Sequence, residues 1–397
     1  MRTTTNAPGQ ALLVICVSSG LWAFSFGLGA PLASLWLKNA GCSDTIIGLN
    51  QAVYYLGLAL AALAVPAFMR VLGPSFSAWG MAVAGVTVAL FPFGDTLTWW
   101  FGLRLLCGMA GAVSLIPMET YVNRDLAPEH RGRNIGLYWV ALTVGGALGN
   151  WVGFAMVAAT PRIAFLVGGA LPLVATLLVY AYLPTIQVRR ETKPQVVTIR
   201  LRENLLSFGS AWSQGFLEGG FIAFLSLYLI AMGLTQQHVG WLISAAMIGV
   251  IAFQVPVSWF GDYFGRQTVL LVCYGLVAVG LIVLPLAGPS ALLPVSLLVV
   301  CACSAAFYPL GLALLGENLP AGQLDRANAW YLSVECVGSL MGPALMGVAR
   351  DWAGEAAMFA VGEAAVLVVL ATWLLGRRKD APVAIAETPQ SAPRKAA

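Results

Sequence analysis

The segment QVRRETKPQVVTIRLREN (residues 187–204) is the only long polar stretch in the interior of the chain. Strongly apolar sequence lies on both sides of it. We interpret the segment as a linker between two similar halves, because a composition shift of this kind marks a boundary. The expected organisation is a first half at 1–184, a linker at 185–204, a second half at 205–376 and a disordered polar tail at 377–397.

The composition of the flanking sequence indicates a membrane protein. Of the 397 residues, 59% are hydrophobic and 10% are charged, whereas a soluble domain has about 25% charged residues. A single soluble core could not hide so much apolar surface. Lipid offers no partner for backbone amides, so helices are the expected spanning form. The apolar runs are too long and alternate too little for an outer-membrane barrel. The sequence therefore predicts an all-α membrane protein.

A helix needs about 20 apolar residues to cross the hydrocarbon core, and twelve segments of the sequence fit this requirement. They span 10–37, 46–69, 76–93, 98–121, 134–158, 163–183, 205–232, 238–260, 268–287, 291–316, 328–349 and 356–376. No small-residue cleavage site with a polar region behind it follows the first segment. We therefore interpret that segment as a retained helix and not as a signal peptide.

The distribution of basic residues predicts the orientation in the membrane. Of the 21 Lys and Arg residues, only Lys38, Arg162 and Arg350 fall in predicted outer segments when the amino terminus is placed inside, and Arg104 falls within a span. All the others lie in predicted inner segments, as the positive-inside rule requires. Both termini are then expected in the cytoplasm. The formal net charge of +4 reflects this orientation and does not indicate nucleic-acid binding.

The two halves can be aligned with each other at a nearly constant offset. SLWL at 34–37 matches SLYL at 226–229, and glycines recur at equivalent positions. The aligned glycine pairs are Gly27 with Gly219, Gly48 with Gly240, Gly57 with Gly249, Gly73 with Gly265, Gly145 with Gly338 and Gly149 with Gly342. Because six spans separate the copies, the two halves point the same way. Such parallel repeats are one of the known transporter architectures, although chance similarity between apolar helices is the alternative.

The sequence shows no constellation typical of an enzyme. The only histidines are His130 and His238, and the seven cysteines have no metal-ligand spacing. No phosphate-binding loop for ATP is visible. We therefore expect no catalytic residues, no metal and no cofactor.

The loop SWFGDYFGRQ (258–267) carries a resemblance to a known family. Gly265 permits a tight turn, Arg266 holds the loop at an anionic membrane face, and Asp262 can pair with a helix N-terminus or a neighbouring basic group. The loop resembles the Gly-x-x-x-Asp-Arg-x-Gly-Arg-Arg signature of the major facilitator superfamily, with Ser258 in place of the first glycine. The equivalent first-half loop, AFMRVLGPS (67–75), keeps only Gly73 and has Arg70 at the Asp position. The second-half copy is therefore expected to dominate gating.

Further motifs extend the resemblance over essentially the whole chain. GWLISAAMIG, GDYFGR, FYPLGLAL and VGSLMGP are similar to segments of the small bacterial YcaD-like members of the superfamily. The resemblance implies two pseudo-symmetric six-helix bundles that alternate access to a central site in a bacterial inner membrane. It also implies a role for Arg104, which with Gly108 matches the family's Arg-x-x-x-Gly pattern, in proton coupling or in holding the cavity. The alternative is an Arg104 that pairs with backbone carbonyls or with one carboxylate.

Four intramembrane carboxylates are candidates for proton or substrate binding. Glu218 is the strongest, because Gly215, Gly219 and Gly220 weaken the helix around it, and interrupted helices at mid-membrane mark transport sites. Trp212, Gln214 and Phe216 could supply stacking and a hydrogen bond. Glu335 shares a helix face with Tyr331, four residues earlier, and Glu119 lies toward the inner side. Each could instead have a structural role, and a structural or interfacial role is favoured for Glu363 in the last span.

Two aromatic segments could line the cavity. FSFGLGAP (24–31) and AFYPLGL (306–312) contain Gly and Pro residues that bend helices. Their ring-bearing residues, Phe24, Phe26, Phe307 and Tyr308, are candidates for this lining. Packing against lipid or neighbouring helices is the alternative for each.

The sequence thus predicts a monomeric secondary transporter that moves a small organic solute with the proton as coupling ion. Neutral sugars, amphiphilic drugs and aromatic vitamins remain possible solutes, and import or export stays open. The alternative is a non-transporting membrane sensor or scaffold with the same fold. The partners expected are the solute, the proton and the lipid bilayer.

Overall fold

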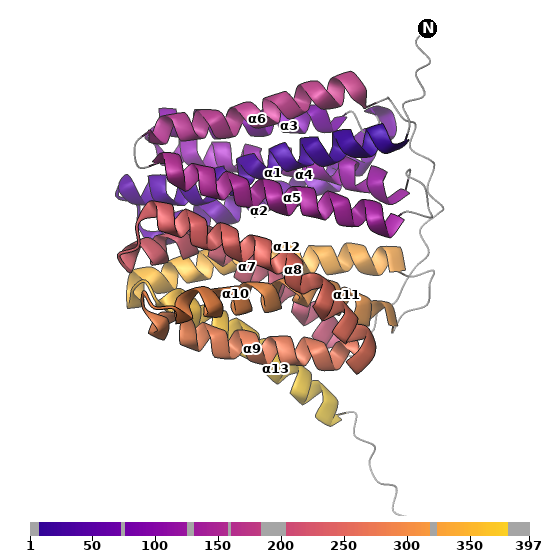
Figure 1. The fold of residues 1–397 in the computed structure, drawn as a ribbon, viewed down its shortest axis with the longest axis vertical. Helices are drawn as coiled ribbons and strands as arrows, with labels where there is room; N and C mark the ends of the chain where they lie inside the picture. The colour runs from indigo at the N-terminus through magenta and orange to yellow at the C-terminus, as the bar shows by residue number, and fades with distance from the viewer. Residues whose placement is uncertain are drawn as a thin grey trace, which may run out of the picture.

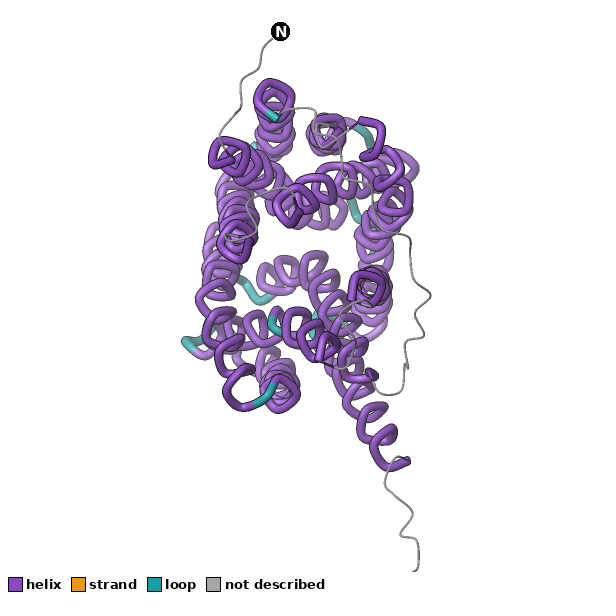
Figure 2. Tube along the Cα trace, turned by 90° about the vertical axis from the view of Figure 1, so that its right-hand side faces the viewer, coloured by secondary structure: helices purple, strands orange, loops and turns teal. Residues whose placement is uncertain are grey.

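A computed structural model describes residues 8–72, 76–124, 131–157, 160–183, 204–317 and 324–379, and all regular elements in these ranges are helices (Figure 1). The elements are α1 (Pro8–Asn39), α2 (Asp44–Leu72), α3 (Ser77–Leu90), η2 (Phe91–Phe93), α4 (Leu97–Arg124), α5 (Arg131–Val157), α6 (Pro161–Tyr182), α7 (Leu205–Ala231), α8 (Gln236–Phe264), α9 (Arg266–Ala287), α10 (Leu292–Ala305), α11 (Phe307–Glu317), α12 (Leu324–Ala353) and α13 (Ala357–Lys379). Figure 2 looks along the helices and shows that most of them lie along one axis.

Eleven segments of the described residues are long and apolar enough to cross a membrane, and they coincide with eleven of the predicted spans. The remaining prediction, 76–93, corresponds to α3 and η2, a shorter apolar segment from Ser77 to Phe93. The predicted linker lies outside the described residues except for Asn204. Residues 377–379, which were assigned to the tail, form the end of α13.

Prolines account for the two interruptions within predicted spans. The ring of a helical proline clashes with the carbonyl four residues earlier and removes a hydrogen-bond donor. Pro92 lies where α3 gives way to the 3-10 turn η2. Pro309 lies just after the break at Ala306 that separates α10 from α11. The second of these breaks falls in the segment that the sequence marked as bent.

The helices form two groups. In Figure 1 the helices α1–α6, indigo to magenta, lie above α7–α13, orange to yellow. Within the first half, α1 packs along α5 and α3 along α6; within the second, α7 packs along α12 and α9 along α13. Between the halves, α2 packs along α12 and α5 along α8.

Glycines at aligned positions of the two halves make equivalent contacts. A Cβ atom on Gly145 would overlap the Gly20 carbonyl of α1, and one on Gly149 would overlap the Phe24 carbonyl. In the second half, Gly338 and Gly342 of α12 lie in the same way against the carbonyls of Trp212 and Phe216 on α7. Glycine is required at these positions because the helix backbones touch.

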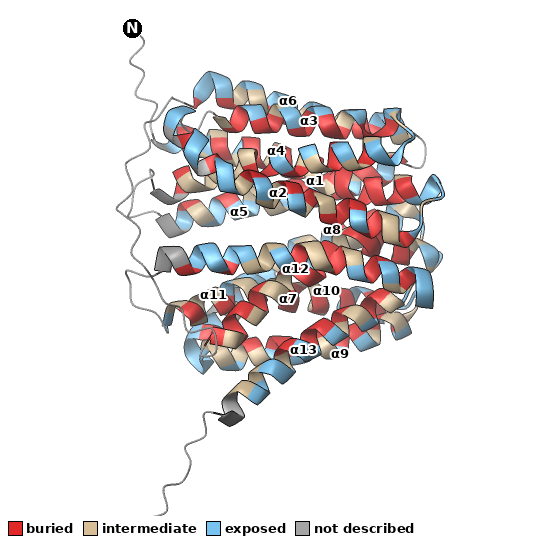
Figure 3. Ribbon diagram, turned by 180° about the vertical axis from the view of Figure 1, so that it is seen from behind, coloured by how far each residue is buried: buried red, intermediate tan, exposed pale blue. Residues whose placement is uncertain are grey.

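Contacts between the halves gather at one end of the molecule. Gly48, near the start of α2, lies against the Pro343 carbonyl, and Gly347, near the end of α12, lies against the Asp44 carbonyl. On the other side, the Asn150 side chain donates to the Gly240 carbonyl of α8 at 3.1 Å. We call this the closed end; residues 40–43 and 354–356 lie there. Toward the start of α12, exposed and half-buried residues dominate (Figure 3).

The glycine contacts predict a selective effect of adding a single methyl group. Gly145→Ala and Gly149→Ala should each lower the free energy of unfolding by about 1–3 kcal/mol, because the new Cβ overfills a backbone contact. Thermal unfolding of the purified protein in detergent measures the effect.

Gly136→Ala is the matched control on the same helix, because nothing lies within 4 Å of a Cβ at that position. This variant should leave the midpoint temperature of thermal unfolding unchanged or raise it, since alanine has a higher helix propensity than glycine. Equal midpoints for all three variants would contradict the proposed backbone contact between α1 and α5.

Candidate functional site

Glu218 lies near the middle of α7, a helix in which most residues are buried. Its neighbours Leu217 and Gly219 are buried, yet the Glu218 side chain is exposed. Gln214, one turn earlier, donates from Nε2 to Glu218 Oε2 at 3.2 Å. Because α7 packs against helices of both halves, this exposure indicates an opening toward the space between the halves and not toward lipid.

Residues of both halves lie around this carboxylate. Tyr54 and Tyr55 of α2 are within electrostatic range of Glu218. Glu335 of α12 is within electrostatic range of both Glu218 and Glu119. The structure thus places Glu335 of α12 near two further candidates, Glu119 of α4 and Glu218 of α7.

The predicted aromatic lining divides into half-buried and buried rings. Trp212 is half-buried and its ring lies 5.0 Å from that of Phe216. Tyr308 of α11 is also half-buried and interacts electrostatically with Glu335. Phe216 and Phe307, by contrast, are 1% and 0% exposed. These two rings belong to the core in this conformation. They could line a cavity only in a different conformation of the protein.

The first-half aromatics occupy intermediate positions. Phe24 is half-buried, and its carbonyl supports the backbone contact with Gly149. Phe26 stacks on Trp22 with ring centroids 5.6 Å apart and also contacts Tyr54 at 5.1 Å. Phe26 is therefore part of the packing that positions Tyr54.

Tyr331 is fully buried, although it shares a helix face with Glu335. Its hydroxyl donates to the Tyr308 carbonyl at 2.9 Å and lies 3.0 Å from Ser210 Oγ. These contacts tie α12 to the first turn of α11, directly after the helix break. In this structure, the Tyr331 hydroxyl holds the interrupted helix and makes no hydrogen bond to a carboxylate among the described residues.

Arg104 is 4% exposed and lies between α4 and α2. Its Nη2 donates to Gln51 Oε1, and the guanidinium stands 5.4 Å from the ring centre of Tyr54. Its partners are therefore an amide and an aromatic face, instead of the carboxylate or backbone carbonyls considered above. Nε faces no hydrogen-bond partner among the described residues.

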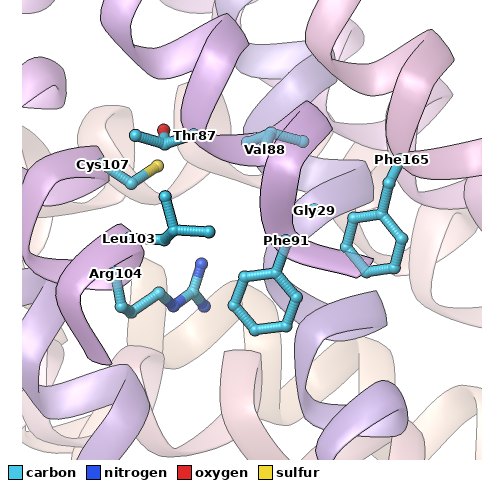
Figure 4. A pocket seen from close by; sticks show the side chains of 8 residues that line it. All are labelled: Gly29, Thr87, Val88, Phe91, Leu103, Arg104, Cys107 and Phe165. Carbon is cyan, nitrogen blue, oxygen red and sulfur yellow. The ribbon is translucent and has the colours of Figure 1, made fainter. Parts of the chain in front are cut away.

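A small cavity of about 10 Å³ adjoins Arg104 (Figure 4). It lies within the first half, where Thr87, Phe91, Cys107 and Phe165 contribute to its wall. A space of this size is about that of one water molecule. Arg104 therefore faces α2 and the interior of the first half, and Tyr54 and Tyr55 of α2 are within electrostatic range of both Arg104 and Glu218.

The predicted gating loop adopts the turn that its glycine allows. Gly265 has a φ of 87°, in the left-handed region that favours glycine. Arg266 Nη2 donates to Asp262 Oδ1 at 3.2 Å, Nη1 donates to the Ala313 carbonyl at 3.0 Å, and Nε lies 3.4 Å from Glu317. These contacts all lie within the second half. Of the first-half loop, Gly73 lies outside the described residues.

Sequence reasoning missed a cluster of charged residues at the closed end. Arg350 Nε lies 3.1 Å from Asp44 Oδ2, and both residues are 3% exposed. Lys38 Nζ lies 2.8 Å from Asp44 Oδ1 and 3.8 Å from Glu355, which also pairs with Arg350. Asp351 accepts hydrogen bonds from the backbone amides of Asp44 and Thr45, each at 2.8 Å. We call Lys38, Asp44, Arg350, Asp351 and Glu355 the closed-end ion cluster.

A signal for this cluster was present in the sequence. Lys38 and Arg350 are two of the three basic residues in predicted outer segments, and each of these segments also contains an acidic residue, Asp44 and Asp351 respectively. Opposite charges in two such segments could have suggested a contact. The sequence could not show that these two segments meet.

Comparison with known proteins identifies the family of this helical structure. The model of the Major Facilitator Superfamily matches residues 14–236 and again residues 205–396. The chain therefore belongs to the major facilitator superfamily of transporters, which confirms the resemblance drawn from the loop motif.

Among relatives, the chain is 28% identical over 353 residues to the uncharacterized MFS-type transporter YfkF of Bacillus subtilis strain 168. The aligned region covers 86% of this chain and 87% of YfkF. The chain is 24% identical over 344 residues to the uncharacterized MFS-type transporter YcaD of Escherichia fergusonii, with coverages of 83% and 87%. The similarity to YcaD agrees with the segments noted in the sequence.

Three solved structures show the same fold. A mutant of the nucleoside transporter NupG has a TM-score of 0.80 at 14% identity, and the match covers 92% of this chain and 99% of the NupG chain. A D-xylose–proton symporter has a TM-score of 0.74 at 14% identity, with coverages of 91% and 97%. A bacterial homologue of the lysosomal transporter Spinster, in an inward-facing and occupied conformation, has a TM-score of 0.73 at 14% identity, with coverages of 94% and 98%.

The surroundings of Arg104 predict a coupled pair. Arg104→Met and Gln51→Leu should each lower stability by about 1.5–3 kcal/mol, because each leaves the other polar group buried without its partner. The double variant should cost less than the sum of the two, as in a double-mutant cycle. Thermal unfolding midpoints of the four proteins measure the coupling.

Arg162→Met serves as the control, because Arg162 is an exposed arginine at the start of α6. Its substitution should change stability by no more than about 0.5 kcal/mol. Strictly additive effects of Arg104→Met and Gln51→Leu would show that the two side chains are not coupled.

Proposed function

We propose that the chain is a secondary active transporter that moves a small organic solute by alternating access, with protons as the coupling ion. The observation that carries this proposal is Glu218, an exposed carboxylate in the middle of a largely buried membrane helix. An intramembrane charge is costly, so its retention beside an accessible space is typical of a transport pathway. The family supports transport in general, and the finer statements here are our proposal.

The proposed orientation places both termini in the cytoplasm and the closed end outside. It follows from the distribution of Lys and Arg in the sequence, with Ser77–Phe93 as the twelfth span. The conformation is then inward-facing, since contacts between the halves gather at the closed end. The similarity to a Spinster homologue in an inward-facing conformation agrees with this. Because the curated relatives are bacterial, we propose a bacterial inner membrane as the location and a monomer as the working unit.

The carboxylates provide the proposed coupling device. Glu335 is within electrostatic range of both Glu119 and Glu218, and neighbouring carboxylates disfavour simultaneous ionisation. Binding or release of a proton would change the charge of the central site and hence its affinity for solute. The fold shared with a D-xylose–proton symporter makes this mode of coupling reasonable.

The charge of the site also limits the solute. Arg104 is the one Lys or Arg inside the predicted spans, and it is buried against Gln51 and Tyr54, away from the exposed Glu218. A site with several carboxylates and an occupied arginine disfavours anionic solutes. We therefore propose an uncharged or cationic solute, with Trp212 and Tyr308 available for stacking.

A solute screen followed by a flux assay tests the proposal. Sugars, nucleosides and organic amines are first compared for thermal stabilisation of the purified protein, because a bound ligand raises stability with its concentration. The stabilising solute is then offered to proteoliposomes under an imposed pH gradient. Glu218→Gln should reduce gradient-driven accumulation to the level of protein-free vesicles, since its amide cannot take up and release the proton.

Glu363→Gln on α13 is the matched control, because it removes a carboxylate from a helix at the periphery of the second half and should leave accumulation intact. Full gradient-driven accumulation by a folded Glu218→Gln variant would refute the coupling role of Glu218. Absence of flux in the unmodified protein for every stabilising solute would favour the sensor or scaffold alternative.

A further inference from the structure

We infer that the closed-end ion cluster is a lock on the outward-opening step, and that Arg350 and Asp351 are positioning residues that set how readily this step occurs. The inference rests on the proposed function, because only alternating access would require the closed end to open. It assigns a role in the transport cycle to residues that lie outside the family's loop signature.

The ion pair between Asp44 and Arg350 joins the two halves directly. Asp44 begins α2 of the first half, and Arg350 lies in the last turn of α12 of the second half. Both are almost fully buried, at 3% exposed, with Arg350 Nε 3.1 Å from Asp44 Oδ2. Separation of the halves leaves Asp44 paired with Lys38 and Arg350 paired with Glu355, but it breaks the ion pair between Asp44 and Arg350 and exposes both buried groups to water. Opening of this end is thus linked to hydration of Arg350 and Asp44.

Asp351 adds a second link of a different kind. The first backbone amides of a helix have no partner within that helix. Asp351 Oδ1 accepts from the Asp44 amide and Oδ2 accepts from the Thr45 amide, both at 2.8 Å. A carboxylate of one half therefore caps the first turn of a helix in the other half, where the helix dipole favours a negative charge. Separation of the halves would remove this cap.

The remaining contacts hold Arg350 in place within its own half. Nη1 donates to the Glu355 carbonyl at 2.9 Å, and the guanidinium stands 4.9 Å from the ring centre of Phe224 on α7. Arg350 is therefore preorganised to receive Asp44 when the halves meet. This arrangement suits a contact that is broken and remade in every cycle.

Only one of the two interfaces at this end carries such charges among the described residues. Where α5 meets α8, Asn150 donates to Ser244 Oγ at 3.0 Å, and Ser244 donates to the Ala147 carbonyl at 2.8 Å. These bonds are neutral and cost less to exchange for water than charged ones. The α2–α12 interface therefore dominates the electrostatic resistance to opening at this end, and the contacts of Arg266 with described residues all lie within the second half.

Distance measurement between spin labels at the closed end tests the inference. The seven native cysteines are replaced by serine, and cysteines are introduced at Thr98 and Ala291, two exposed positions at this end in opposite halves. Pulsed electron paramagnetic resonance in lipid nanodiscs then reports the proportion of molecules with the end closed or open. Arg350→Met should raise the open-to-closed ratio by at least about tenfold.

Two variants separate positioning from mere structural support. Arg350→Lys keeps the charge and should restore most of the closed population, whereas Arg162→Met removes an exposed arginine elsewhere and should leave the distances unchanged. If Arg350→Met fails to fold, Asp351→Asn provides the test, because it alters only the exposed cap on α2. Asp351→Asn must then also raise the open-to-closed ratio. Unchanged distances in a folded Arg350→Met or Asp351→Asn protein would overturn the inference.

The outcome is distinguishable from failure of the proposed function. A shift toward the open state together with absence of flux for all solutes would retain the lock and reject transport. Flux in the unmodified protein together with distances that do not respond to either variant would retain transport and reject the lock.

Discussion

A charge removed from bulk water, whether within the membrane interior or buried in protein, must be paired, hydrated or neutralised, and this constraint accounts for the main polar features of the structure. Arg104 is paired with Gln51 and Tyr54 inside the first half. Glu218 is exposed beside the space between the halves. Arg350 is buried but joined to Asp44. Three solutions to the same energetic problem thus occur in one chain, and they correspond to support of a helix pair, a proposed transport site and a proposed lock.

The two halves share their backbone packing but not their charges. Gly145 and Gly149 contact α1 as Gly338 and Gly342 contact α7, so the close helix pairs are built alike. Arg104 occurs only in the first half, whereas Glu218 and Glu335 occur only in the second. In the proposed transport cycle, the similar packing lets the halves reorient about a shared centre, and the unequal charges make the two sides of that centre chemically different. The same inequality appears at the closed end, where charges join α2 to α12 and neutral groups join α5 to α8.

Sequence patterns predicted the local features well. Eleven of the predicted spans were confirmed, because the length of an apolar run is a local property that decides whether a helix can cross a membrane. The turn at Gly265 was likewise anticipated from its residue type. The spacing of Tyr331 and Glu335 placed them on one helix face, yet Tyr331 bonds to Ser210 and to the Tyr308 carbonyl. Helical periodicity fixes which residues share a face but not which neighbour that face meets.

The sequence by itself determined that this protein is helical and membrane-embedded, because composition and hydrophobic length need no knowledge of neighbours. It also determined the superfamily, through a short loop motif and a repeat of glycines. Only the tertiary structure decided that Arg104 faces α2, that Phe307 is buried, and that Asp44 meets Arg350 from a position 306 residues away in the chain. The physical reason is that the electrostatic energy of a buried charge depends on the atoms within a few ångströms of it, and folding brings those atoms from distant parts of the sequence.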